Sequence, residues 1–179
     1  MPRYAMTVDQ RLCVTCNACV IACKDENQVP AGAARCWTAQ VERGAYPHLS
    51  MELRSERCNH CEQAPCVTAC PTRASHYEAG GMVEITPGKC VGCKACIIAC
   101  PYEVRYMHPE GYVDKCTFCD HRVRLGLLPE CVVVCPTDAL SFGDLDDPHS
   151  KVRQQLETRH FFVLKPEQDT HPKLFFLTS

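Results

Sequence analysis

The sequence contains no long apolar run. A membrane-spanning helix needs about 18 or more continuous apolar residues, whereas the longest apolar stretches here are short pieces such as residues 131–135. Residues 1–6 contain neither an apolar secretion segment nor a twin-arginine signal. We therefore expect a chain without a transmembrane segment or signal peptide of its own, which would leave the cytoplasm only by export together with a partner.

Signals for nucleotide or nucleic-acid binding are also missing. Neither G-x-G-x-x-G nor GxxxxGK[ST] occurs, so no phosphate-binding glycine loop is predicted. The formal net charge of −2 provides too little positive charge for a nucleic-acid-binding protein. Four isolated histidines are interpreted as surface residues or as supports of metal ligands, not as catalytic bases: His60, His76, His108 and His121.

Cysteine, in contrast, is abundant, with 17 cysteines among 179 residues. Sixteen of them form four groups of four, each opening with CxxC and closing with CxxxC. The third group reads C-x2-C-x2-C-x3-C-P, the ligand run of a two-cluster bacterial ferredoxin, whose fourth cysteine serves the neighbouring cluster. Sixteen thiolate ligands predict four 4Fe-4S clusters. The groups are Cys13, Cys16, Cys19 and Cys23; Cys58, Cys61, Cys66 and Cys70; Cys90, Cys93, Cys96 and Cys100; and Cys116, Cys119, Cys131 and Cys135.

Disulfides, zinc and c-type haem are the rival uses of these cysteines. Repeated CxxC pairs are a metal-ligand pattern and not a typical disulfide framework. Structural zinc sites usually join two separated CxxC pairs, whereas here a third and a fourth cysteine follow each opening pair. No histidine directly follows a CxxC, which excludes c-type haem. Iron–sulfur clusters are therefore favoured over disulfides and zinc.

The roles of Cys36 and of the lysines next to the cysteine ligands are considered separately. Cys36 belongs to no group and is interpreted as a small buried apolar residue. Four bound clusters would bring the total charge to about −10. The lysines next to a ligand either offset part of this charge or are ordinary solvated side chains: Lys24, Lys89, Lys94 and Lys115.

Internal repetition predicts duplicated modules. Residues 70–74 (CPTRA) and 135–139 (CPTDA) match closely, and residues 100–104 (CPYEV) form a looser copy. Strand pairs are predicted within 76–86 and 40–54, helical turns near the third cysteine of each group, and a helix from Asp147-Pro148 to about Thr158. The predicted fold class is α+β, with two ferredoxin-like lobes, loop-rich extensions and a fold held by metal, so that the apo-protein is largely unfolded.

Two segments allow two interpretations each. Residues 120–130 lengthen the fourth group, either as an exposed docking loop or as a tolerated surface insertion. The apolar segments 161–164 and 174–177 form a tail that packs on its own domain or lies against another subunit.

With these groups assigned, the sequence resembles the iron–sulfur subunit of membrane-bound molybdopterin oxidoreductases of the dimethyl sulfoxide reductase family. The four-group arrangement, the order of the widened gaps and residues 111–119 (GYVDKCTFC) carry the resemblance. Residues 142–148 (FGDLDDP) and 172–176 (PKLFF) are similar to the polysulfide, thiosulfate and tetrathionate reductase branch. The resemblance extends from about Arg3 to Phe176.

The resemblance implies that the groups exchange their closing ligands. It implies an inserted lobe at residues 58–110, an enclosing lobe at 1–57 plus 111–143, and a C-terminal helix and docking tail at 144–179. Some family members have tryptophan in the third group and a 3Fe-4S cluster, but Cys93 is present here. The implied ligand sets are Cys13, Cys16, Cys19 with Cys135; Cys116, Cys119, Cys131 with Cys23; Cys58, Cys61, Cys66 with Cys100; and Cys90, Cys93, Cys96 with Cys70.

The resemblance also implies a function. The clusters would conduct electrons between a molybdenum- or tungsten-pterin catalytic subunit, facing the first lobe, and a quinone-reactive membrane subunit, facing the second. Since every cluster would be fully ligated, we expect no catalytic residue and no direct small-molecule substrate. The expected location is the periplasmic face of the membrane through these partners, with the cytoplasmic face as the alternative. The alternative functions are a free soluble polyferredoxin, or the electron-transfer subunit of a hydrogenase or formate dehydrogenase.

Overall fold

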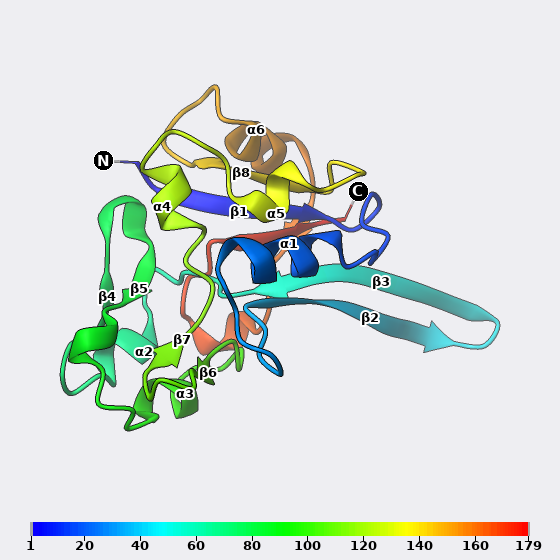
Figure 1. Ribbon diagram of the computed structural model, residues 1–179. Coiled ribbons are helices and arrows are strands. Elements are labelled where there is room, and N and C mark those ends of the chain that lie inside the picture. The colour runs from blue at the N-terminus through cyan, green and yellow to red at the C-terminus, as the bar shows by residue number, and fades with distance from the viewer. Residues whose placement is uncertain (1, 179) are drawn as a thin grey trace.

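A four-stranded sheet joins the two ends of the chain in the computed structural model, which describes residues 2–178 (Figure 1). The strand order is β8-β1-β10-β9. The first strand, β1, pairs antiparallel with β8 and parallel with β10, and β10 pairs antiparallel with β9. The strands are β1 (Tyr4–Asp9), β8 (Leu140–Asp144), β9 (Phe161–Phe162) and β10 (Leu174–Leu177).

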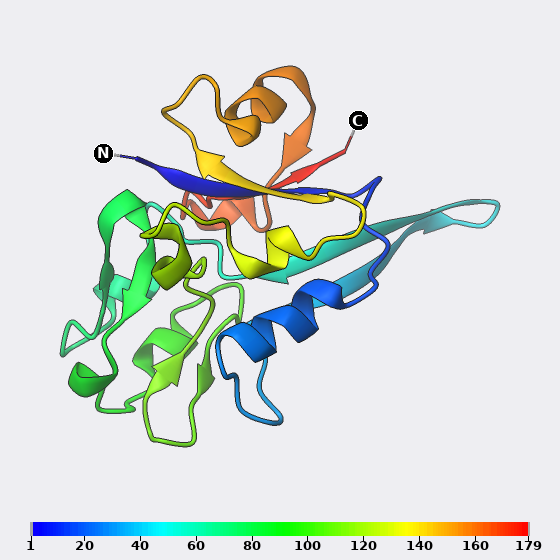
Figure 2. The same ribbon diagram turned by 45° about the horizontal axis from the view of Figure 1, so that its top comes forward.

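The sheet separates a small apolar cluster from the main core, because side chains alternate along β1. Ala5 lies with Val152 of helix α6 (Lys151–Thr158), whereas Met6 and Val8 belong to the main core. The hydroxyl of Thr7 donates to Oε1 of Gln155 on the same helix at 2.7 Å. Figure 2 shows α6 on one side of the sheet and the cysteine-rich part of the chain on the other.

The C-terminal apolar segment packs on its own chain. Strand β10 lies between β1 and β9, and its residues Leu174, Phe176 and Leu177 are fully buried. The segment predicted as a docking tail is therefore an internal strand, which corresponds to the first of its two interpretations. The three-part division of the chain stays a prediction.

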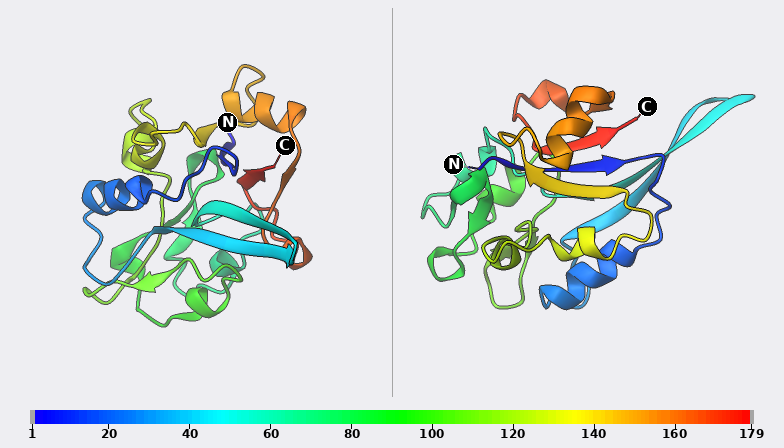
Figure 3. Two further views of the ribbon diagram at one scale, coloured as in Figure 1. Left: turned by 90° about the vertical axis from the view of Figure 1, so that its right-hand side faces the viewer. Right: turned by 90° about the horizontal axis from the view of Figure 1, so that it is seen from above.

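A long hairpin projects from the body of the molecule (Figure 3). Strands β2 (Cys36–Ala45) and β3 (His48–Arg57) pair in register over ten residues each. Tyr46 at its tip is exposed, whereas Cys36 and Arg57 at its base are buried. The strand pair predicted within 40–54 is thus confirmed, and it extends further toward the base than the sequence indicated.

The remaining elements are short and surround the cysteine groups. A helix or helical turn contains or adjoins the third cysteine of each group, as predicted, and the strand pair within 76–86 is confirmed as β4 and β5. The helices are α1 (Ala18–Glu26), α2 (Pro65–Thr68), α3 (Ala95–Ile98), α4 (Asp120–Val123) and α5 (Glu130–Val133), and the strands are β4 (Ser75–Tyr77), β5 (Val83–Ile85), β6 (Tyr106–Met107) and β7 (Val113–Asp114); 3-10 turns lie at Ala79–Gly81, Pro87–Lys89 and Pro166–Gln168.

One predicted helix boundary is wrong. The helix expected to begin at Asp147-Pro148 begins at Lys151, with Ser150 at the N-cap. The Asp147 carboxylate accepts a hydrogen bond from the backbone N–H of His149 at 2.8 Å, and its carbonyl accepts one from Ser150 at 3.0 Å. Asp147 therefore closes a turn before the helix, because its side chain competes for backbone donors.

Helices and strands are mixed throughout, so the fold is α+β as predicted. Among residues 2–178, none of the helices combines the length and apolar character needed to cross a bilayer.

The internal position of β10 predicts the effect of a cavity mutation. Leu174 is 0% exposed, so Leu174→Ala should destabilise the isolated holo-subunit by about 2–5 kcal/mol. For a chain of this size, each kcal/mol corresponds to about 2–4 °C in Tm. Differential scanning calorimetry measures the change, with Leu125→Ala as the control because Leu125 is 76% exposed. Equal Tm values for the two variants would contradict the internal placement of β10.

Candidate metal centres

Three cavities are each lined by three cysteines of one group and the closing cysteine of another. Among residues 2–178, no three cysteine, histidine or acidic side chains converge on a position suited to a single metal ion. The thiols stand instead around these three cavities. They are lined by Cys13, Cys16, Cys19 and Cys135; by Cys58, Cys61, Cys66 and Cys100; and by Cys70, Cys90, Cys93 and Cys96.

The remaining four cysteines meet around Asn27 and Arg57. The Asn27 amide nitrogen lies 3.7 Å from the sulfur of Cys23 and 3.8 Å from that of Cys119. Cys131 lies close to both Cys116 and Cys119, and its sulfur accepts a hydrogen bond from Arg57 at 2.7 Å. The structure thus brings together Cys23, Cys116, Cys119 and Cys131, although they come from the first and fourth groups.

The backbone of the four groups repeats an unusual conformation. The residue before the second cysteine has a positive φ in every group: Thr15 (51°), His60 (43°), Gly92 (65°) and Phe118 (54°). Left-handed residues in such loops turn successive N–H groups toward one side and form an anion-binding nest, which is common at iron–sulfur sites. Four sulfur-lined sites in these loops therefore suit anionic clusters held by thiolates.

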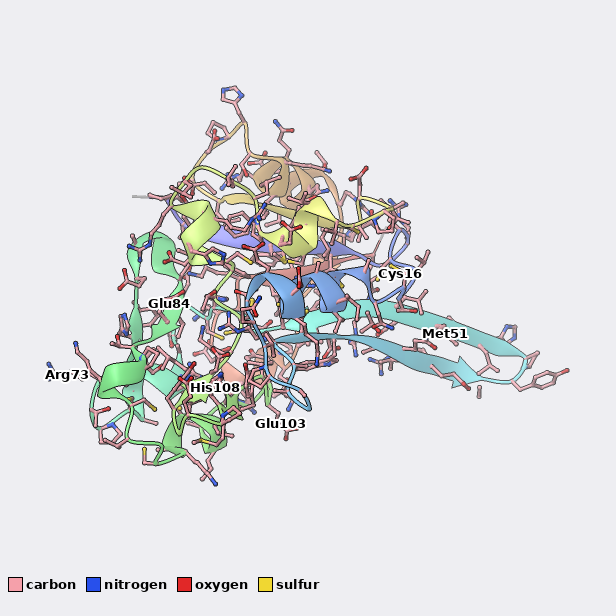
Figure 4. The ribbon with its side chains drawn as sticks, viewed as in Figure 1. Cys16, Met51, Arg73, Glu84, Glu103 and His108 are labelled. Atoms are coloured by element: carbon pink, nitrogen blue, oxygen red, sulfur yellow. The ribbon has the colours of Figure 1, made fainter. Side chains whose placement is uncertain are left out.

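The four sites differ in exposure, which divides them into two outer and two inner sites. We define the outer sites as those of Cys16 and Cys93, the two exposed cysteines among the sixteen. Figure 4 places Cys16 on one side of the molecule and Arg73, three residues after Cys70, on the opposite side. We define the inner sites as those of Cys58 and Cys116, whose cysteines are all buried.

The two inner sites are joined by a stacked pair of rings. His60 lies between Cys58 and Cys61, and Phe118 between Cys116 and Cys119. Their ring centroids are 3.8 Å apart with planes inclined by 19°. Burial, aided by nearby cations, holds the pKa of His60 well below its usual range, so the ring is neutral. The pair forms a closely packed contact between two halves of the cysteine-rich region. We define one half as the Cys16 and Cys116 sites and the other as the Cys58 and Cys93 sites.

The other three histidines are less deeply placed. His121 contacts Glu26 at 2.7 Å, His76 contacts Glu78 at 3.1 Å, and His108 stacks on Tyr112. Of the four predicted surface or supporting histidines, only His60 is fully buried.

Buried cations accompany the buried sulfurs, and the sequence did not single out the most important ones. Arg57 and Arg105 are 1% and 5% exposed, and each donates a hydrogen bond to a cysteine sulfur. Burial alone would lower the pKa of Arg57, but the neighbouring cysteine sulfurs raise it well above its ordinary value. Both arginines stand close to a cysteine group, which is the one signal that could have identified them.

Cys36 and the lysines next to the cysteine ligands, whose roles the sequence did not decide, lie in different environments. Cys36 is buried at the hairpin base, as predicted, and its thiol contacts the carbonyl of Cys19 at 3.6 Å. Lys115 is buried, and its ammonium donates to the carbonyls of Val83 and Cys116. Lys24 is half-buried and Lys89 and Lys94 are exposed, so Lys115 is the adjacent lysine best placed to offset cluster charge.

The insertion at 120–130 forms α4 and an exposed turn. Leu125, Leu127 and Leu128 are exposed on it. Arg122 pairs with Glu26 at 3.1 Å and with Glu130 at 2.8 Å, which fixes the base of the insertion to α1 and α5. The insertion is therefore anchored at its base and apolar at its surface.

Known proteins with 4Fe-4S domains are similar to this chain. Residues 49–145 and residues 12–74 each match a family described as a 4Fe-4S dicluster domain. The NrfC protein of Escherichia coli strain K12 is 44% identical over 177 residues, covering 97% of this chain and 79% of that protein. The B subunit of the tetrathionate reductase of Salmonella typhimurium is 42% identical over 180 residues, covering 98% and 72%. The B subunit of the polysulfide reductase of Wolinella succinogenes is 42% identical over 181 residues, covering 99% and 95%.

The sulfur-lined sites and these matches define an iron–sulfur electron carrier with four 4Fe-4S clusters, as the cysteine groups predicted. Within that class, the chain belongs to the family of 4Fe-4S dicluster subunits that includes the electron-transfer subunits of polysulfide, tetrathionate and thiosulfate reductases. The family resemblance stated from the residues is confirmed. The chain is an electron-transfer subunit and not the catalytic subunit of its oxidoreductase.

A buried carboxyl group on β5 predicts a pH-dependent stability. Burial raises the pKa of Glu84 from 4.5 to about 7, so folding takes up a proton between these values and the wild-type loses stability as the pH rises through them. The loss is on the order of 3 kcal/mol. Glu84→Gln does not titrate, so its Tm advantage over the wild-type should grow between pH 5 and pH 8. The exposed Glu110→Gln is the control, and a pH-independent difference for Glu84→Gln would contradict the assigned pKa.

Proposed function

We propose that the chain conducts electrons between a molybdenum- or tungsten-pterin catalytic subunit and a quinone-reactive membrane subunit of an anaerobic respiratory oxidoreductase. The observation that carries this proposal is that the closing cysteine of one group lines the cavity of another group. This arrangement gives four fully thiol-lined sites, of which the two outer ones lie on opposite sides of the molecule. An electron path with two ends suits a subunit held between two partners.

The ligand sets of the proposal combine the three opening cysteines of each group with a closing cysteine from its partner group. The clusters supply one-electron chemistry when bound, and the protein supplies thiolates, nests and burial. The proposed sets are Cys13, Cys16, Cys19 and Cys135; Cys116, Cys119, Cys131 and Cys23; Cys58, Cys61, Cys66 and Cys100; and Cys90, Cys93, Cys96 and Cys70.

The clusters also hold the fold in this proposal. Eleven of the sixteen cysteines are buried, and they make up much of what would otherwise be the apolar core. Buried thiols without metal would leave these cavities poorly packed. Metal binding therefore supplies a large part of the folding free energy.

Each outer site offers an exposed apolar side chain beside its exposed cysteine. Val14, which lines the Cys16 site, is 55% exposed, and Val91, which lines the Cys93 site, is 68% exposed. The core of a protein interface typically contains few charged side chains and many apolar contacts. In the proposed orientation, the Cys16 end faces the catalytic subunit and the Cys93 end faces the membrane subunit, so the chain is attached to the membrane through its partners.

The exchange of closing ligands can be tested by paired cysteine variants. Cys13→Ser and Cys135→Ser should abolish or alter the same electron paramagnetic resonance signal, because both residues line one cavity although they are far apart in sequence. Iron should fall from about 16 toward about 12 atoms per chain in each variant. Cys36→Ser is the matched control and should keep all the iron. Loss of different signals in the two variants would exclude the proposed sets.

The proposed orientation can be tested by placing a charge at either end. Val14→Asp should reduce the molybdenum or tungsten that co-purifies with the complex at least tenfold, because it buries a charge against the catalytic subunit. Val91→Asp should release the chain from the membrane fraction and leave that metal in place. The two variants serve as controls for each other. A complex that keeps both partners in both variants would contradict docking at the outer sites, and a wild-type chain without molybdenum or tungsten would indicate a free carrier or a hydrogenase partner.

A further inference from the structure

Each half of the cysteine-rich region contains one buried arginine that hydrogen bonds to both a cysteine and a serine. We propose that these two arginines, Arg57 and Arg105, link an inner to an outer site in each half and raise the reduction potential of the inner site. This inference rests on the proposed ligand sets and assigns a tuning role to residues that are not ligands.

We call each arginine, together with the serine that it contacts, a bridge between an inner and an outer site. The first bridge, Arg57 with Ser55, lies at the base of the hairpin. Arg57 donates from Nη1 to the Cys131 sulfur at 2.7 Å and from Nη2 to the Ser55 hydroxyl. The Ser55 oxygen lies 3.3 Å from the Cys19 sulfur, and Ser55 lines the outer cavity of Cys19. Because this oxygen accepts from the arginine, its own hydrogen is free to point at Cys19. The bridge thus reaches one ligand of the inner site and one of the outer site.

The second bridge, Arg105 with Ser75, makes the same kinds of contact from other segments of the chain. Arg105 donates from Nη2 to the Cys66 sulfur at 2.8 Å and to the Ser75 hydroxyl at 3.1 Å. The backbone N–H of Ser75 donates to the Cys70 sulfur at 3.4 Å, and Ser75 lines the outer cavity of Cys70. Cys66 lines an inner cavity. In both halves, therefore, the guanidinium donates a hydrogen bond to a sulfur of the inner site, and the serine contacts the outer site. Arg105 also lies close to Cys96 of the outer site.

Within the described part of the chain, neither guanidinium group is neutralised by a carboxylate. Arg35 by comparison forms a two-fold contact with Asp114 at 2.9 Å, and Arg54 pairs with Glu56 at 3.1 Å. Among residues 2–178, Arg57 and Arg105 make no such ion pair, and Nε of each has no hydrogen-bond partner. Within the same range, the anionic groups placed to compensate these buried charges are the thiolates and the clusters that they hold.

The expected electrical effect follows from the sign of the charge. Arginine stays protonated in proteins, and reduction adds one negative charge to a cluster. A buried positive charge in contact with a ligand stabilises the reduced state, and hydrogen bonds to sulfur act in the same direction. A sulfur of the inner site accepts a short hydrogen bond from the guanidinium in each half. A sulfur of the outer site, Cys19 or Cys96, lies close to the guanidinium without such a short bond, and the serine contacts that site. The inner sites should thus have the higher potentials within each half.

The decisive experiment is a potentiometric titration of the complete holo-protein, followed by electron paramagnetic resonance and accompanied by iron analysis. Cys131→Ser first identifies the signal of the inner site. Arg57→Gln should then lower the midpoint potential of that same signal by about 59 mV or more. For one electron, this shift corresponds to a tenfold change in the reduction equilibrium constant. Arg57→Lys should recover most of the potential. Arg54→Gln is the matched control on the same strand and should change nothing.

A second variant keeps the test decisive if Arg57→Gln fails to retain iron. Ser55→Ala preserves the arginine and should lower the potential of the outer signal that is lost in Cys19→Ser. Unchanged potentials in Ser55→Ala with full iron would overturn the bridge, as would unchanged potentials in an iron-replete Arg57→Gln. A shift in a signal other than the one lost in Cys131→Ser would instead show that the ligand sets are wrong, which separates the two failures.

Discussion

Sixteen cysteine sulfurs are crowded into four sites, and both the buried cations and the path of the chain follow from this crowding. Most of these sulfurs are buried, and as thiolates they would repel one another strongly in a medium of low dielectric constant. Iron compensates part of this charge, and buried cations compensate more. Arg57, Arg105 and Lys115 are buried in the cysteine-rich region, and the neighbouring sulfurs raise the pKa of both arginines against the effect of burial.

The same crowding explains the path of the chain. In the proposed ligand sets, a group whose closing cysteine serves another site cannot complete its own site alone, so the first and fourth groups must meet although about 100 residues separate them. The sheet brings them together, because β1 leads into the first group and pairs with β8, which follows the fourth. Strand β10 then pairs with β1 and brings the end of the chain into the same sheet.

The sequence predicted the parts of the molecule that short-range patterns encode. The cysteine groups, the strand pair β4–β5 and the hairpin β2–β3 follow from spacing, turn residues and alternation within a few residues. The resemblance supplied the exchange of closing ligands, since no local pattern shows which groups meet. The start of α6 was misplaced because Asp147 can cap a helix or close a turn, and the sequence does not distinguish these uses. Arg57 and Arg105 were missed because an arginine beside a ligand is indistinguishable in sequence from a solvated one until burial is known.

We propose that iron–sulfur clusters, more than apolar packing, hold this chain in its fold. Far-UV circular dichroism of the complete protein, recorded while a chelator removes the iron anaerobically and the thiols are kept reduced, measures how far the fold depends on the clusters. We expect the native spectrum to be lost in proportion to the iron, and the iron-free chain to be largely unfolded. An iron-free chain that keeps the native spectrum would contradict this proposal.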